Sequence, residues 1–134
     1  MQESRGAPLP LPDKEERPTV LVCDDEPNLR ELIRVTLGEG YTVVEAGDGH
    51  EALELARRSP PDLVILDLMM PRGSGFEVLA ELRRDARLAS VPVVVVTAQP
   101  ATADEAVAAG ADHVLGKPFS SDELVELAAN LTQR

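Results

Sequence analysis

The stretch LVILD, residues 63–67, carries four apolar residues in succession and ends on a carboxylate. A strand with one solvated face alternates apolar and polar residues, whereas a strand covered by helices on both faces is nearly continuous in apolar residues. The run VVVVT, residues 93–97, has the same character. These two segments therefore predict a parallel sheet that is buried between two layers of helices.

The segments around these runs alternate between strand and helix patterns. Residues 29–37 and 124–131 each place apolar side chains on one helical face. Short connections between alternating strands and helices require right-handed crossovers on both faces of a sheet. The sequence therefore predicts a doubly wound α/β domain with its ligand site at the carboxyl ends of the strands. Runs rich in β-branched residues predict the strands at residues 19–23, 41–45, 62–66, 91–96 and 113–115.

The sequence also marks where helices begin and end. Three helix starts place a capping side chain three residues before a glutamate that can reach back to it. We expect Gly38 and Gly40 to end the first helix, because glycine adopts a left-handed turn at little cost. Gly110 is expected to end a short helix over residues 102–109 in the same way. The capping pairs are Asp48 with Glu51, Ser74 with Glu77, and Ser120 with Glu123.

The length of 134 residues fits one domain with one hydrophobic core. Residues 1–18 hold four prolines, many charges and no periodic apolar face, which predicts a disordered tail before a domain at residues 19–134. No apolar run approaches the roughly 18 residues that span a bilayer. The N-terminus lacks a basic segment followed by a long apolar one, so we expect no export signal.

The charge balance restricts the classes of partner. The net charge is −11, with 24 acidic and 13 basic residues. This charge opposes direct binding to nucleic acid and to anionic membrane surfaces, and it favours cations or basic faces of partner proteins. The single Cys23 lies within an apolar run, so it is predicted to be a buried core residue that cannot form an internal disulfide. These features fit a reducing cytoplasm.

Carboxylates follow two of the predicted strands. Asp24 and Asp25 come directly after the first strand, and Asp67 follows the third. The carboxyl ends of parallel strands meet at one edge of the sheet, so the three side chains are expected to converge there. Thr97 and Lys117 reach the same edge from the fourth and fifth strands. Hard oxygen ligands suit Mg²⁺, and a hydroxyl and an ammonium group suit the oxygens of a phosphoryl group.

Four segments carry a resemblance to a known family. They are VCDDEPN at 22–28, LDLMMPRGSGFE at 66–77, VVVVTA at 93–98 and GADHVLGKPF at 110–119. Together they resemble the receiver domain of two-component response regulators, over residues 19–131. The resemblance implies a flavodoxin-like (βα)5 fold whose five parallel strands lie in the order 2-1-3-4-5.

The resemblance also implies roles for the acidic residues. Asp67 would accept a phosphoryl group from a sensor histidine kinase or a phosphotransfer protein. Asp24, Asp25 and Asp67 would hold Mg²⁺, Asp24 through a water molecule, and the backbone carbonyl of Met69 would complete the protein ligands.

The remaining site residues follow from the same resemblance. Thr97 and Lys117 would bind the phosphoryl oxygens, and the Lys117–Pro118 peptide bond would be cis. The modified protein would then present a changed surface to a downstream protein that the sequence does not identify, and the oligomeric state stays open. The chain ends soon after the last predicted helix, so we expect no effector domain in it, and it is either a stand-alone receiver or part of a longer protein.

Two features depart from the family pattern. Receivers usually carry an aromatic residue three positions before the lysine, and this chain has Val114 there. The segment from Thr97 to Gly110 is about two residues shorter than in similar domains, and Pro100 restricts where its helix begins. The helix in this segment is expected to be short or displaced, and the path from Thr97 to an output surface is left open.

The same residues are compatible with other functions. A Mg²⁺-dependent phosphatase with an aspartyl-phosphate intermediate would carry a second acid two residues after the nucleophile, where this chain has Met69. A flavin-binding domain would need a glycine-rich loop after the first strand. A receiver-like scaffold that is never phosphorylated is a third possibility. Read alone, Thr97 is an ordinary strand end, and Gly73 and Gly75 are expected only to permit loop geometry.

Overall fold

A computed structural model of the chain describes residue 13, residues 16–70 and residues 74–133. The sheet has five strands, all paired in parallel in the order β2-β1-β3-β4-β5. This order confirms the predicted flavodoxin-like (βα)5 architecture. The strands are β1 (Thr19–Cys23), β2 (Thr42–Ala46), β3 (Leu63–Asp67), β4 (Val93–Thr97) and β5 (His113–Gly116).

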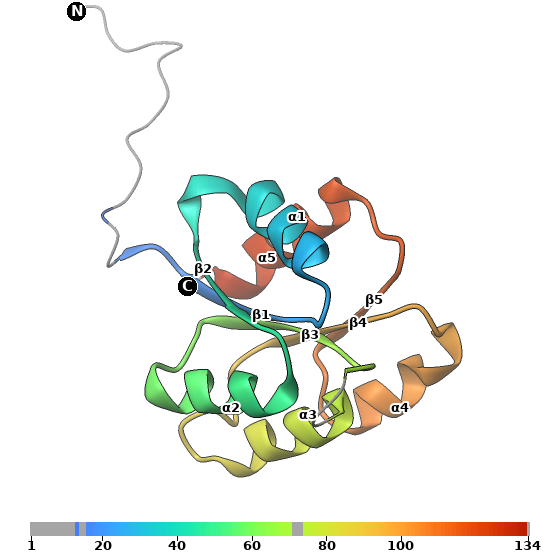
Figure 1. Cartoon of the computed structure of the whole chain (residues 1–134). Coiled ribbons are helices and arrows are strands. Elements are labelled where there is room, and N and C mark those ends of the chain that lie inside the picture. Colours follow the sequence, from blue (N-terminus) through green and yellow to red (C-terminus); the bar gives the residue numbers. More distant parts are fainter. Residues whose placement is uncertain (1–12, 14–15, 71–73, 134) are drawn as a thin grey trace, which may run out of the picture.

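The helices cover both faces of this sheet. In Figure 1, α1 and α5 lie on one face, and α2, α3 and α4 lie on the other. Every residue of β3 and β4 is buried, as their continuous apolar runs predict for strands between two helical layers. The helices are α1 (Pro27–Leu37), α2 (Gly49–Arg58), α3 (Gly75–Arg84), α4 (Ala103–Ala108) and α5 (Ser121–Thr132), with 3-10 helices η2 (Gly38–Gly40) and η3 (Pro100–Thr102).

The strand boundaries agree with the predicted ones within about two residues. The largest shift is at β4, which begins at Val93 rather than at residue 91. Pro92 has no backbone N–H for a sheet ladder, and the N–H of Val91 instead bonds the carbonyl of Leu88 at 3.1 Å. Val91 therefore closes the turn before the strand.

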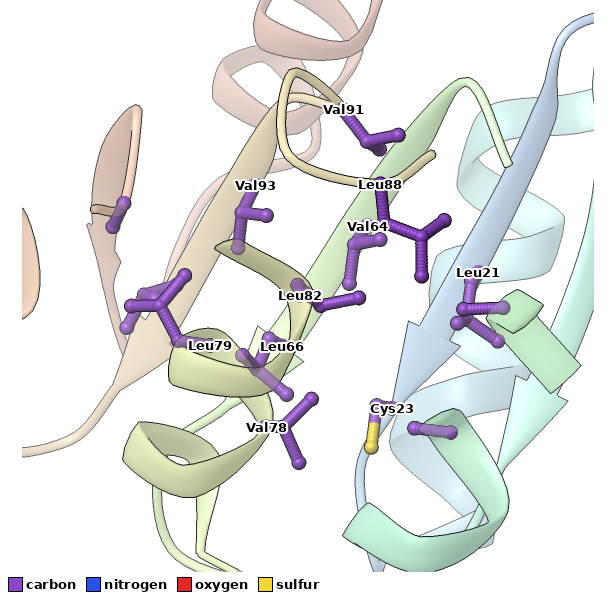
Figure 2. Packing of buried hydrophobic residues seen from close by; sticks show 14 of the residues in the cluster. Leu21, Cys23, Val64, Leu66, Val78, Leu79, Leu82, Leu88, Val91 and Val93 are labelled. Carbon is purple, nitrogen blue, oxygen red and sulfur yellow. The ribbon is translucent and has the colours of Figure 1, made fainter. Parts of the chain in front are cut away.

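The core has one cluster on each face of the sheet. On the α3 face, Val78, Leu79 and Leu82 pack over Val64 and Leu66 of β3, as Figure 2 shows. Leu88 and Val91, which follow α3, belong to the same cluster (Figure 2). Each fully buried leucine or valine of this kind stabilises the fold by about 1.5–3 kcal/mol relative to an exposed one. The packed cluster supports the sheet from the α3 face.

Cys23 lies in the same cluster, as predicted (Figure 2). Burial is the main reason why the pKa of its thiol is raised to about 12, and the nearby Asp24 adds to the effect. A thiol with so high a pKa is almost wholly protonated at neutral pH. Cys23 is therefore a packing residue.

The predicted helix caps are present with one difference. Ser74 and Ser120 form reciprocal capping boxes with Glu77 and Glu123. Asp48 accepts the N–H of Glu51 at 2.8 Å, but the Glu51 carboxylate reaches one residue further back, to the N–H of Gly47 at 2.8 Å. The reciprocal half of that predicted box is therefore replaced by a bond to the residue before the cap.

Glycine ends two helices. Gly38 caps α1 with φ of 76°, and Gly110 follows α4 with φ of 116°. Gly40 lies within η2, so the prediction that it also ends α1 is wrong. The short helix expected over residues 102–109 is confirmed as α4, and it starts at Ala103 because the chain from Pro100 first turns through η3.

The predicted tail at residues 1–18 lies mostly outside the described residues. Among the residues that the structure describes, no helix has the length and apolar character that a membrane crossing requires.

Candidate functional site

Three carboxylates meet at the carboxyl edge of the sheet. Asp24 and Asp25 follow β1, and Asp67 is the last residue of β3, the strand that pairs directly with β1. Each of the three carboxylates has an oxygen that lies within 4.8 Å of an oxygen of each of the other two. Asp24 is 2% exposed and Asp67 is 5% exposed, whereas Asp25 faces solvent. The convergence expected from the strand order is therefore present, with an open side at Asp25.

Lys117 brings a positive charge to this cluster. Its Nζ lies 3.3 Å from Oδ2 of Asp24 and 3.6 Å from Oδ2 of Asp67. Its backbone N–H donates to the carbonyl of Thr97 at 2.8 Å, which ties the end of β5 to the end of β4. The Lys117–Pro118 peptide bond is cis, as predicted.

The protonation equilibria reflect this crowding. Burial raises the pKa of the Asp67 carboxyl, and the neighbouring Asp24 raises it further against the opposing effects of the Met69 N–H and Lys117. Burial acts to lower the pKa of Lys117, but Asp24 and Asp67 outweigh it and the net shift is upward. The ammonium of Lys117 therefore stays charged and offsets part of the negative charge of the cluster.

Local hydrogen bonds fix the two buried carboxylates. Oδ1 of Asp24 accepts the N–H of Glu26 at 2.9 Å. Nη1 of Arg30 donates to the backbone carbonyl of Asp24 at 2.6 Å. Oδ1 of Asp67 accepts the N–H of Met69 at 3.2 Å, so one oxygen of Asp67 is engaged by its own loop and the other faces Lys117. Met69 itself is 60% exposed, and its contact with Asp67 is made by its backbone N–H.

Gly75 supports the site in a way that sequence reasoning missed. It is the first residue of α3, and its N–H donates to the carbonyl of Leu68 at 3.0 Å. A Cβ at this position would lie 2.5 Å from the carbonyl oxygen of Asp67 and 2.5 Å from Cα of Leu68. The prediction that Gly75 permits loop geometry is wrong, because the residue allows close packing of a helix on the strand end. Gly73 lies outside the described residues.

Thr97 closes β4 at the same edge and is 1% exposed. Its Oγ1 accepts the N–H of Gln99 at 3.0 Å and lies 3.3 Å from Oγ1 of Thr102. Among the described residues, the hydrogen-bond partners of this hydroxyl belong to the connection between β4 and α4. The structure thus places Thr97 at the site edge with its hydroxyl bonded away from the carboxylates.

The two departures from the family pattern expected for this sequence lie in the elements that follow Thr97, α4 and β5. The helix α4 has only six residues. Val114 pairs with Val95 across the sheet and packs against the cluster on the α3 face. The aliphatic side chain of Val114 has no group that can hydrogen-bond to Thr97.

Comparisons with known proteins agree with this geometry. The family model described as response regulator receiver domain matches residues 20–129. "Probable transcriptional regulatory protein TcrX" of Mycobacterium tuberculosis is 44% identical over 110 residues, which cover 80% of this chain and 46% of that protein. The DNA-binding dual master transcriptional regulator RpaA of Synechocystis is 39% identical over 120 residues, which cover 87% of this chain and 50% of that protein.

Solved structures show the same relationship. The receiver domain of the Francisella response regulator 1452 superposes with a TM-score of 0.81 at 33% identity, covering 88% of this chain and 98% of that chain. This chain spans about half the length of these curated relatives. The fold, the site geometry and these matches together establish that the chain belongs to the receiver-domain family of two-component response regulators.

Proposed function

We propose that this receiver is a signalling module that is switched by phosphorylation of Asp67. The observation that carries the proposal is the placement of the Asp67 carboxylate. It is buried at the strand edge, its Oδ2 lies 3.6 Å from the Lys117 ammonium, and an oxygen of each of two other aspartates lies within 4.8 Å. A carboxylate can act as a nucleophile toward phosphorus where nearby cations offset its own charge and that of the incoming group.

The transfer that we propose is an in-line displacement. An oxygen of Asp67 forms a bond to the phosphorus of a phosphohistidine, and the P–N bond breaks with its electron pair returning to the imidazole nitrogen. The product is an acyl phosphate on Asp67 and a free histidine. Such a transfer needs little from the protein beyond positioning and charge neutralisation.

The donor set fits Mg²⁺. Asp24, Asp25 and Asp67 offer carboxylate oxygens, the ligands that this hard cation prefers, and the cluster has an exposed side where waters can remain. We propose the backbone carbonyl of Met69 as a further ligand and a water molecule between Asp24 and the ion. Bound Mg²⁺ would neutralise negative charge on the phosphoryl group.

Lys117 and Thr97 have complementary roles in this proposal. The Lys117 ammonium, already held between Asp24 and Asp67, binds one phosphoryl oxygen as a point charge. The Thr97 hydroxyl donates to another. Both residues approach from the same edge because the N–H of Lys117 is bonded to the carbonyl of Thr97.

The partners that we propose are a sensor histidine kinase or phosphotransfer protein in the cytoplasm and an unidentified downstream protein. A groove of ≈ 570 Å³ beside Lys117 supports docking of a protein, because apolar side chains of Leu29, Leu32 and Phe119 line it. We propose that the domain at residues 19–134 does not itself contact DNA, because the net charge of −11 would repel the phosphate backbone. The domain is a binding module, and its own chemistry is limited to gain and loss of the phosphoryl group.

Intact mass spectrometry after incubation with acetyl phosphate and Mg²⁺ tests the proposal. The native chain should gain one phosphoryl group, and Asp67→Asn should gain none. Asp85→Asn, at the far end of α3, is a matched control that should behave as the native chain does. Equal labelling of the native chain and Asp67→Asn would contradict the assignment of Asp67, and turnover of organic phosphate esters would favour a phosphatase instead.

A further inference from the structure

The Thr97 hydroxyl is engaged in a small network at the start of η3. Its Oγ1 accepts the N–H of Gln99 at 3.0 Å. It also lies 3.3 Å from Oγ1 of Thr102 and 3.5 Å from the carbonyl of Gln99. Thr102 is half-buried and its hydroxyl donates to the same Gln99 carbonyl at 2.7 Å. The network consists of neutral groups, and its hydrogen bonds connect Thr97, Gln99 and Thr102 to one another.

A count of protons fixes the direction of the contact between the two threonines. A hydroxyl has a single proton to donate. The Thr102 proton is committed to the Gln99 carbonyl in a bond of 2.7 Å, so in the 3.3 Å contact Thr97 is the donor and Thr102 the acceptor. The proton of Thr97 therefore points into the β4–α4 connection.

Phosphoryl oxygens accept hydrogen bonds and cannot donate them when ionised. A Thr97 hydroxyl that binds a phosphoryl group on Asp67 must supply its proton to that group. The same Thr97 proton cannot at the same time be donated to Oγ1 of Thr102. Thr97 can therefore donate its proton to Thr102 or to a phosphoryl group on Asp67, but not to both at once.

The segment next to this network is η3 and the short helix α4. Thr102 is the N-cap residue of α4 but makes no side-chain cap to the helix, because its hydroxyl is turned toward Gln99 and Thr97. The six-residue α4 makes its main contacts with β5 and η3. A helix this short draws its stability from such contacts rather than from its own hydrogen bonds.

We propose that Thr102 is a positioning residue that holds the Thr97 hydroxyl away from the phosphoryl site, and that phosphorylation of Asp67 breaks this bond and loosens the η3–α4 segment. The inference rests on the proposed function of Asp67. Thr102 would then connect the phosphorylation site to the surface of the η3–α4 segment. Val114 cannot make this connection through a hydrogen bond, because its side chain is aliphatic. The loosened segment carries Val107, an apolar side chain that is 56% exposed on α4, which a partner protein could contact.

Two variants at residue 102 test the inference. Thr102→Val keeps the shape of the side chain and removes the acceptor, whereas Thr102→Ser keeps the hydroxyl. In the native chain the hydrogen bond from Thr97 to Thr102 competes with the one from Thr97 to the phosphoryl group. Thr102→Val removes this competing bond, so labelling of the chain by acetyl phosphate and Mg²⁺ should be about fivefold faster, the effect expected of one neutral hydrogen bond. Thr102→Ser should label at the native rate. A purely structural role of Thr102 would leave the rate unchanged or lower it.

Amide hydrogen exchange over residues 99–108 provides the second measurement. In the native chain and Thr102→Ser, phosphorylation should raise exchange in this segment about fivefold. In Thr102→Val exchange should already be raised before the donor is added. In a Thr97→Val background the further change Thr102→Val should give no gain in labelling rate.

The results distinguish failure of the proposed phosphorylation of Asp67 from failure of the proposed role of Thr102. Absence of a phosphoryl group on the native chain would overturn the proposed function and this inference with it. Labelling of the native chain with unchanged exchange at residues 99–108 would overturn the inference alone. Equal labelling rates for Thr102→Val and the native chain would also overturn it.

Discussion

Two corners of the same sheet edge differ in how their polar groups are held. At the β1–β3 corner, the buried Asp24 and Asp67 face the ammonium of Lys117. At the β4–α4 corner, the hydroxyl of the buried Thr97 is bonded, within the described part of the chain, to neutral groups of the following turn. Hydrogen bonds between charged groups are roughly twice as strong as those between neutral groups. The polar groups of the first corner are therefore held by stronger interactions than those of the second.

The helices that follow the two corners also differ in length and capping. The backbone at Asp67 is clamped by the close approach of Gly75 at the start of α3, a helix of ten residues with a complete capping box. The backbone after Thr97 passes into a 3-10 turn and a helix of six residues without a side-chain cap. A site that must bind one fixed group needs rigid support, whereas a segment that moves belongs to the less stable parts of a fold.

The largest effect is expected at the charged corner. Lys117→Met removes the cation between the two buried carboxylates, so labelling by acetyl phosphate should fall about a hundredfold, the usual cost of losing one electrostatic stabiliser. Intact mass measured over time gives the rate. Arg58→Met removes a positive charge from an exposed side chain of α2 and should leave the rate unchanged. Similar rates for the two variants would mean that the charged corner is not where the chemistry occurs.

The clamp at Gly75 should be nearly as sensitive. Gly75→Ala forces a Cβ against the backbone of Asp67 and Leu68, and the free energy of unfolding should fall by about 3 kcal/mol. Denaturant titration measures the change. Gly40→Ala is a matched control, since a Cβ there meets nothing within 4 Å, and its effect should stay within about 0.5 kcal/mol. Equal stability of both variants would show that the helix can retreat from the strand end at no cost.

The smallest effect is expected beside the neutral corner, at Val114. Val114→Ala removes half-buried methyl groups, so stability should fall by about 1 kcal/mol while the labelling rate changes by less than about twofold. Thermal unfolding and intact mass report the two quantities. A large loss of labelling in Val114→Ala would show that this side chain couples to Thr97 after all, and it would weaken the case for Thr102.

The sequence predicts the charged corner better than the neutral one for a physical reason. The strand order places residues 24, 25 and 67 together because continuous apolar runs such as LVILD allow few arrangements of a parallel sheet. The side chains at these positions then bring three carboxylates together. The network of Thr97, Gln99 and Thr102 depends on rotamers and on a 3-10 turn, which no periodicity in the sequence encodes.

The role of Gly75 and the partner of Glu51 were missed for a related reason. A glycine after a capping serine has several explanations, and only the distance from a hypothetical Cβ to the Asp67 backbone decides between them. The Glu51 carboxylate has two backbone N–H groups within reach, and the chain direction at Gly47 selects one. Strand ends and helix starts are predicted from pattern, whereas contacts between them require the folded backbone.

The central claim is that a divalent cation shares the acidic cluster with Asp67. Calorimetric titration of Mg²⁺ into the metal-free chain tests it most directly, with Asp25→Asn as the variant and Glu39→Gln on η2 as the control. We expect one site in the native chain, unchanged affinity in the control, and affinity about tenfold weaker in Asp25→Asn, as loss of one nearby charge predicts. Absence of binding, or equal affinity in the native chain and Asp25→Asn, would contradict the account.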